Sequence, residues 1–143
     1  MKKEITTIEY CAGFIDGEGY IGILKAKYKW KGIDYGYRYF IPVISVGSTY
    51  KPIIEVLNKT LKESVEKQQV YNKFGNRKLA YRWVQKGNKS VKKVLDLVKS
   101  DLIIKKELAN LVYKCCITKS KKEKEKLYLK CRKLNKRGLA ETE

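Results

Sequence analysis

Two carboxylates lie close together in a glycine-rich segment near the N-terminus of the chain. This segment runs from Cys11 to Gly19 and contains Asp16 and Glu18, with Glu18 placed directly after Gly17. A helix that ends at this Gly-Glu-Gly sequence would project one carboxylate where backbone carbonyl groups have no partner within the helix. Oxygen ligands of this kind suit Mg²⁺, which usually keeps waters and also takes phosphate oxygens. Glu18 and the backbone of Gly17 are therefore candidate metal ligands, whereas Asp16 is expected to accept hydrogen bonds near the helix end.

The composition restricts the chemistry that the rest of the chain could supply. The 143 residues include no His, which excludes His-based zinc sites, His general bases and the His-activated nucleophiles of many hydrolases. The four Cys show no Cys-x-x-Cys spacing, so we interpret them as reduced thiols in the core. A metal ion that activates water at a phosphodiester needs no His. Carboxylates, lysines, tyrosines and a hard metal ion therefore remain for catalysis.

The strong positive charge indicates a polyanionic partner. Lys and Arg number 33 against 15 Asp and Glu, which gives a net charge of +18 and favours nucleic acid. An anionic membrane surface is the competing partner, but the chain has no run of about 18 apolar residues and its basic C-terminal segment has no Trp- or Phe-rich face. No small-molecule substrate is indicated. No signal peptide is recognisable after Met-Lys-Lys-Glu, so we expect the protein to act inside a cell or an organelle rather than to be secreted.

The glycine-rich segment should be carried by a short helix. Thr6 and Glu9 have the spacing of a capping box, so the helix should begin near Thr7. Apolar residues recur at helical spacing along one of its faces. Gly17 and Gly19 are expected to end it.

A long β-hairpin is predicted from residue 20 to residue 46, with its turn at residues 31–34. Alternating residue types support this prediction over most of its length. In its second arm Tyr35, Tyr37 and Tyr39 share one face of the strand. A single bulge would exchange the two faces, so the register is open at this stage.

The remaining elements complete one α+β domain with the order α-β-β-α-β-β-α. Pro52 suits the first turn of a helix with an apolar stripe, and a second hairpin with strands at 69–73 and 79–85 turns at 74–76. Two further helices follow, and Ser100 and Asp101 are candidate caps of the second of them. We place the core domain at residues 1–118 and a basic helical tail at 119–143. That tail is either a solvated charged helix or an arm that contacts phosphates. The apolar positions that mark the three helices are Ile53, Ile54, Leu57 and Leu61, then Val91, Val94, Leu95 and Val98, then Ile104, Leu108, Leu111, Val112 and Cys115.

The motif Cys11-Ala12-Gly13-Phe14-Ile15-Asp16-Gly17-Glu18-Gly19 resembles the signature of the LAGLIDADG homing endonucleases. The resemblance implies cleavage of both strands of DNA, with Mg²⁺ or Mn²⁺, at a long and partly palindromic site, by a protein whose gene lies in an intron. A single motif implies a homodimer, in which two motif helices pack side by side and bring both Glu18 carboxylates together above the minor groove. The residues implied at that interface are Cys11, Ala12, Gly13 and Phe14.

Two further catalytic candidates come from the same resemblance. The segment Ile104 to Leu111 is similar to the last core helix of the family, which implies that Lys105 is an active-site lysine able to offset charge at the scissile phosphate. Ser48 falls where family members often place a polar side chain that contacts water. An ordinary turn-forming role for the Ser48 hydroxyl stays open.

DNA binding in this family implies an antiparallel sheet that lies in successive major grooves. Each candidate side chain contacts either a base edge or a phosphate, and the sequence leaves the choice between them open. The candidates are Lys25, Lys27, Lys29, Tyr35, Tyr37, Arg38, Tyr39, Arg77, Lys78 and Arg82. Two other functions also stay open: an RNA maturase that assists intron splicing, and a DNA-binding regulator that does not cleave. The presence of both Glu18 and Lys105 favours cleavage over the regulator.

Overall fold

The predicted order of helices and strands is confirmed. The computed structural model describes residues 7–61, 65–71 and 77–141, without the side chains of residues 65–71, 77–79 and 136–141. The elements are α1 (Thr7–Glu18), β1 (Tyr20–Trp30), β2 (Ile33–Ser48), α2 (Lys51–Thr60), β3 (Val65–Tyr71), β4 (Arg77–Lys86), α3 (Asn88–Val98), the short 3₁₀ helix η1 (Lys99–Asp101), α4 (Lys106–Ile117) and α5 (Lys121–Glu141).

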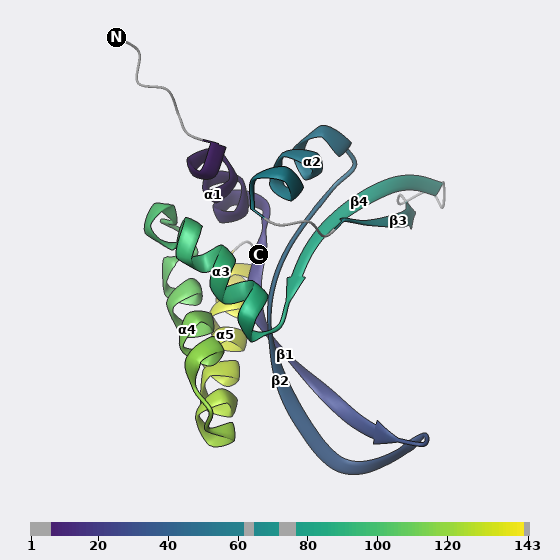
Figure 1. The fold of residues 1–143 in the computed structure, drawn as a ribbon, viewed down its shortest axis with the longest axis vertical. Helices are drawn as coiled ribbons and strands as arrows, with labels where there is room; N and C mark the ends of the chain where they lie inside the picture. The colour runs from purple at the N-terminus through teal and green to yellow at the C-terminus, as the bar shows by residue number, and fades with distance from the viewer. Residues whose placement is uncertain (1–6, 62–64, 72–76, 142–143) are drawn as a thin grey trace.

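The four strands form one antiparallel sheet in the order β1-β2-β4-β3. The helices gather on one side of this curved sheet, and no described element covers its other side (Figure 1). Because side chains alternate between the faces of a strand, the sheet has a helix-covered face and an open face. The core lies between the helices and the covered face, where Trp83, Ile44 and Ile21 are fully buried.

The hairpin of β1 and β2 turns more tightly than predicted. Lys31 and Gly32 both have positive φ angles, 50° and 80°, as a two-residue turn between twisted strands requires. The register also shifts, because Lys27 pairs with Arg38 whereas Lys29 pairs with Asp34. The additional residues of β2 form a bulge that includes a glycine with φ of 81°. This bulge bends the hairpin beyond the edge of the helical layer.

The helix after η1 begins later than predicted. Ser100 and Asp101 belong to the 3₁₀ helix and do not cap α4, which begins at Lys106. Ile104 was expected on the apolar stripe of α4, yet its side chain is 76% exposed. The physical reason is a long-range contact with Asp16, described below, that fixes the chain just before α4.

The basic C-terminal segment is helical and packs against the core. α5 contacts α4 and β1, and it buries Leu127 and Cys131 in the same apolar cluster as the other helices. The ring of Tyr128 also lies 5.4 Å from that of Phe40, measured between centroids. Thus α5 shares the hydrophobic core of the domain through Leu127 and Cys131. Among the described helices, none combines the length and the apolar character that crossing a membrane requires.

Candidate active site and nucleic-acid interface

The motif forms α1 and the turn that follows it. α1 continues through Gly17 to Glu18, so the prediction that Gly17 ends the helix is wrong. Gly19 ends it instead, and its N–H donates to the carbonyl of Ile15 at 2.9 Å. A Cβ atom at Gly19 would lie 2.8 Å from that oxygen, a distance that only a glycine avoids. The chain can therefore turn directly from α1 into β1.

Asp16 connects α1 to the start of α4. Its side chain is only 7% exposed. It accepts hydrogen bonds from the backbone N–H groups of Ile103 at 3.1 Å, Ile104 at 3.0 Å and Lys105 at 2.8 Å. Burial alone would raise the pKa of Asp16, but these hydrogen bonds and the nearby charge of Lys105 together hold the pKa below its ordinary value. The expectation that Asp16 accepts hydrogen bonds is thus confirmed, although the donors come from a distant part of the chain.

Lys105 is brought to the C-terminal end of α1 by the same contact. Its Nζ atom donates to the backbone oxygen of Asp16 at 2.6 Å. That oxygen belongs to the last turn of α1, where carbonyl groups lack helical partners and the helix dipole favours a cation. The ammonium group of Lys105 therefore binds the helix end at Asp16, which is two residues before Glu18 in the sequence.

We expect Asp16→Asn to lower the free energy of unfolding by about 3 kcal/mol at neutral pH, because charged hydrogen bonds to buried donors are lost. The sign with pH follows from the lowered pKa of Asp16. The stabilisation is present above the pKa of the unfolded chain and is lost as the pH falls through the lower, folded pKa. Urea denaturation of both proteins at one protein concentration measures this difference, which should shrink below about pH 4.

Asp96→Asn is the matched control for this experiment. Asp96 forms an exposed ion pair with Lys92 at 3.1 Å, and such pairs contribute at most about 1 kcal/mol. If Asp16→Asn were as stable as this control variant, Asp16 would not hold α1 to α4.

Glu18 lies exposed at the end of α1. Beside the Lys105 ammonium group, the Glu18 carboxylate and the carbonyl groups at the negative end of the helix supply oxygen ligands of the kind that a hard cation takes. Within the described residues, no group of three or more acidic, Cys or His side chains could hold a metal ion. A cation at Glu18 and the backbone of Gly17 would therefore not be held by a cluster of such side chains from the described residues.

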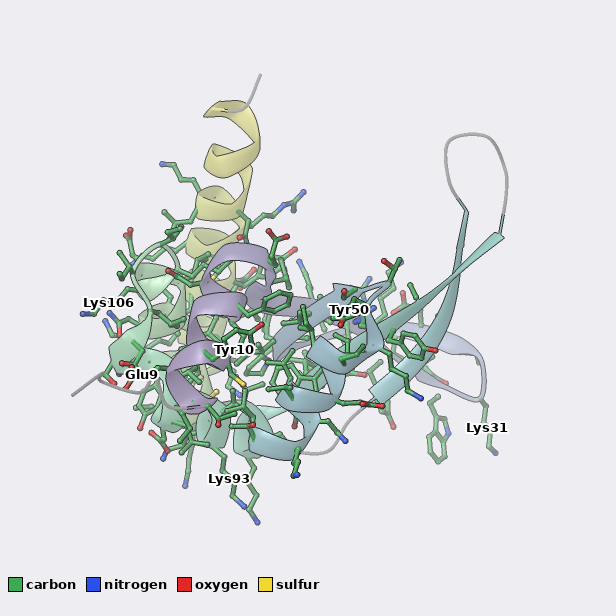
Figure 2. All side chains as sticks on the ribbon, turned by 90° about the horizontal axis from the view of Figure 1, so that it is seen from above. Glu9, Tyr10, Lys31, Tyr50, Lys93 and Lys106 are labelled. Carbon is green, nitrogen blue, oxygen red and sulfur yellow. The ribbon has the colours of Figure 1, made fainter. Side chains whose placement is uncertain are left out.

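The exposed face of α1 differs from the predicted interface. Cys11 and Ala12 are fully buried in the core of the chain itself, so the prediction that they contact a partner subunit is wrong. The reason is the helical period, which points them into the chain's own core, where α1 packs against α2, α3 and β2. Gly13 and Phe14 remain accessible, and no atom lies within 4 Å of a Cβ built on Gly13. Figure 2 shows α1 in the foreground, with the 49% exposed Tyr10 on it and no described element in front.

Two isoleucines next to the site were missed as surface residues. Ile103 is 84% exposed and Ile104 is 76% exposed, although both lie between the buried Leu102 and the start of α4. They give the molecule an exposed apolar surface beside Asp16, near the end of α1. The sequence shows two adjacent aliphatic residues at this position, which indicates an apolar contact. Their outward orientation becomes apparent only in the structure, where Asp16 holds their backbone N–H groups.

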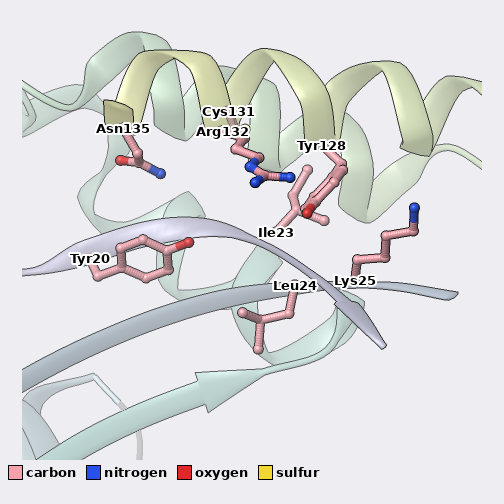
Figure 3. A pocket seen from close by; sticks show the side chains of 8 residues that line it. All are labelled: Tyr20, Ile23, Leu24, Lys25, Tyr128, Cys131, Arg132 and Asn135. Carbon is pink, nitrogen blue, oxygen red and sulfur yellow. The ribbon is translucent and has the colours of Figure 1, made fainter. Parts of the chain in front are cut away.

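The predicted DNA-contacting residues do not share one face of the sheet. Lys25 pairs with Phe40 and Lys27 with Arg38, so these two lysines lie on the covered face, beyond the helices. In Figure 3 the Lys25 side chain is drawn on the α5 side of β1. Tyr39 belongs to the open face. The alternation along the strands thus places Lys25 and Lys27 on the opposite face from Tyr39.

Other candidates have partners within the chain or fall outside the described side chains. Arg38 forms an ion pair with Asp34 at 3.0 Å. Ser48 accepts a hydrogen bond from the N–H of Tyr50 at 3.0 Å, which is a turn contact. The Lys121 ammonium lies 4.2 Å from the centre of the Tyr37 ring. Lys29 and Tyr35 are exposed near the hairpin turn, and Arg82 is half-buried on the open face. The side chains of Arg77 and Lys78 lie outside the described residues.

The cysteines are unpaired thiols, as expected. Cys11, Cys115 and Cys131 are buried and Cys116 is half-buried. Burial raises the pKa of Cys131 to about 12 and that of Cys116 to about 12. Both thiols are therefore protonated at neutral pH, which makes them poor nucleophiles.

Structure comparison connects this arrangement to proteins that cut DNA, whereas no family model and no curated protein sequence matches the chain. The homing endonuclease I-CvuI in complex with its target is 18% identical, with a TM-score of 0.67 over 90% of this chain and 79% of that one. The archaeal intron-encoded homing endonuclease I-Vdi141I, complexed with DNA, is 18% identical with a TM-score of 0.55, over 76% and 65% of the two chains. The LAGLIDADG homing endonuclease I-GzeII is 17% identical, with a TM-score of 0.57 over 79% of this chain and 35% of that one. The chain has the LAGLIDADG homing endonuclease fold.

Within the LAGLIDADG fold, the described part of the molecule has two uncovered surfaces. The exposed side of α1, with Gly13, Phe14 and the nearby Ile103 and Ile104, is apolar and uncovered. The open face of the sheet forms the second surface. Glu18 lies where the LAGLIDADG helix joins the first strand of that sheet.

Proposed function

We propose that this protein is a sequence-specific endonuclease that cleaves double-stranded DNA as a homodimer, using a divalent metal ion. The observation that carries the proposal is the end of α1, where exposed Glu18 ends the helix and the ammonium group of Lys105 binds the carbonyl of Asp16, on a LAGLIDADG fold. Structural neighbours of this fold were solved with DNA targets. Glu18 is an exposed acid at the negative end of a helix, on a chain whose net charge is +18. A cation bound there would compensate this local negative charge.

The residues at this helix end fit a hard cation, because all available donors are oxygen atoms. Mg²⁺, or Mn²⁺ in its place, would be held by Glu18 and the backbone of Gly17 and would supply an activated water and stabilise the leaving oxygen. The neighbour I-CvuI was solved with DNA in the presence of Ca²⁺ and, on another target, of Mg²⁺. These findings support a divalent ion.

The chain's own side chains divide the remaining work. Glu18 brings negative charge to the helix end and thereby selects a cation. The Lys105 ammonium is held by the Asp16 carbonyl and would offset negative charge on the scissile phosphate. Because Asp16 fixes the backbone of Lys105, the lysine needs little reorganisation. Ser48 stays a proposed water contact whose hydroxyl hydrogen is available to donate.

The uncovered face of α1 supports the proposed homodimer. Gly13 has open space where a second helix could approach closely, and Phe14 lies beside it. A twofold axis through this face would pair two Glu18 residues, one for each DNA strand. Ile103 and Ile104 would then lose their exposure to water, which favours association.

Binding can be tested without cleavage by using the Glu18→Gln variant in Ca²⁺. We expect this variant to bind duplex DNA in a strongly salt-dependent way, because phosphate contacts supply most of the affinity. Fluorescence anisotropy with a labelled random-sequence duplex measures non-specific affinity, and a pool of structured RNA of equal length serves as competitor. Preferential binding of the RNA would support the maturase function instead. Specific DNA binding by wild-type protein without any cleavage would support the regulator.

A further inference from the structure

The open face of the β1–β2 hairpin is apolar where it extends from the body of the molecule. Leu24 pairs across the strands with Ile41, and Ala26 pairs with Tyr39. All four lie on the face opposite to Ile21, Ile23 and Phe40, which are buried under the helices. Figure 3 shows Leu24 pointing away from α5 while Ile23 points toward it.

Two buried valines lie beyond these residues on the open face. Val43 is 2% exposed and Val84 is 4% exposed, and neither belongs to the core cluster beneath the helices. They offer almost no accessible surface, whereas Leu24, at 38%, and Tyr39, at 44%, are exposed. We call the set of Leu24, Ala26 and Ile41 the apolar strip.

Charged groups border the apolar strip and identify its occupant. Lys86 pairs with Val43. Arg82 pairs with Gly47, which is the next pair on the same face after Ser45 and Val84. A lipid or an apolar protein surface would meet these cations unfavourably, whereas DNA presents phosphates on both sides of a groove whose floor carries the base edges. The charge of +18 adds to this complementarity.

The apolar strip would meet the two kinds of base pair differently in a major groove. Both kinds of base pair present two acceptors and one amino donor in the major groove, and none of the three side chains of the apolar strip can bond to them. Losing water from these groups without replacement is costly for either pair. Only the A·T pair also presents a thymine methyl group, which gains from contact with aliphatic side chains and offsets part of this cost.

We infer that the apolar strip is a contact surface for thymine methyl groups, so that the base pairs it covers in each DNA half-site are A·T pairs. This inference rests on the proposed function and specifies its substrate. Leu24 and Ile41, adjacent across the strands, are the specificity-determining pair. Ala26 is small enough to let a neighbouring methyl group approach.

The test begins with a binding site selected from a pool of random duplexes by the wild-type protein in Ca²⁺. We expect a cluster of A·T pairs at the same place in both half-sites. Each thymine is then replaced by deoxyuridine, which removes only the major-groove methyl group. Replacing a contacted thymine in both half-sites should raise the dissociation constant about fourfold for each methyl group lost. Deoxyuridine elsewhere in the site should change it little.

Leu24→Ala identifies the surface that makes the contact. In a double-mutant cycle the deoxyuridine penalty should be smaller for Leu24→Ala than for the wild type, because both changes remove the same contact. Leu129→Ala is the matched control, since Leu129 is 55% exposed on α5. Selection of G·C pairs at these positions, or penalties that add fully, would overturn the inference while leaving DNA cleavage intact. Failure to select any duplex would overturn both.

Discussion

Cleavage by Glu18→Gln is expected to be slower than wild-type cleavage by at least about a thousandfold, which corresponds to about 4 kcal/mol of transition-state stabilisation. The amide keeps the shape of the side chain but removes the charge that would hold a cation at the end of α1. Affinity for DNA should change little, because Glu18 is a single acid on a chain of net charge +18. Single-turnover cleavage of a selected duplex with Mg²⁺ in excess measures the chemical step.

Two further variants make the result specific. Glu125→Gln changes an exposed acid on α5 in the same way and should cleave at the wild-type rate. Lys105→Met should fall between the two, because it removes a positive charge without removing a metal ligand. Equal rates for Glu18→Gln and Glu125→Gln would show that Glu18 has no part in catalysis.

Gly13→Leu is expected to convert the protein into a monomer that folds normally. A Cβ at Gly13 meets no atom within 4 Å, and leucine is a better helix former than glycine. Two leucines facing each other across a twofold axis would prevent close approach of the helices. If this overpacking costs about 3 kcal/mol, the dimer dissociation constant rises roughly a hundredfold. Sedimentation velocity over a range of protein concentrations measures the change.

Lys93→Leu is the control for an added leucine on a helix surface, because Lys93 is exposed on α3. It should leave the oligomeric state unchanged. Double-strand cleavage should be lost in Gly13→Leu together with the dimer. A Gly13→Leu protein that still sediments as a dimer would place the interface elsewhere on the surface.

Local patterns were sufficient to predict most of the fold. The apolar stripe that includes Ile54 and Leu57 gave α2 its buried face, and Pro52 lies in its first turn. The stripe of Val91, Val94, Leu95 and Val98 is buried on α3. These predictions hold because amphipathic periodicity directly determines which face of a helix is buried. The turn residues 74–76 lie outside the described residues, although the strands that flank them pair.

Contacts between distant residues explain why local sequence patterns did not predict the start of α4 or the buried face of α1. α4 begins at Lys106 because Asp16, 89 residues before Lys105, accepts the N–H groups that precede it, and no local pattern contains that contact. Cys11 and Ala12 fit a helix interface by residue type, but they are buried in the core of the chain itself. Lys25 and Tyr39 are both candidate DNA contacts by residue type, and only the observed register shows that they lie on opposite faces.

Sequencing the ends of cut DNA tests whether the protein makes double-strand breaks that depend on Glu18. Purified wild-type protein and Glu18→Gln would each be incubated with Mg²⁺ and a plasmid library that carries random inserts. We expect wild-type protein to make double-strand breaks at one partly palindromic site, with short 3′ overhangs across a single minor groove. We expect Glu18→Gln to leave the same site intact. The absence of cleavage by the wild type, or the same breaks made by Glu18→Gln, would contradict the account.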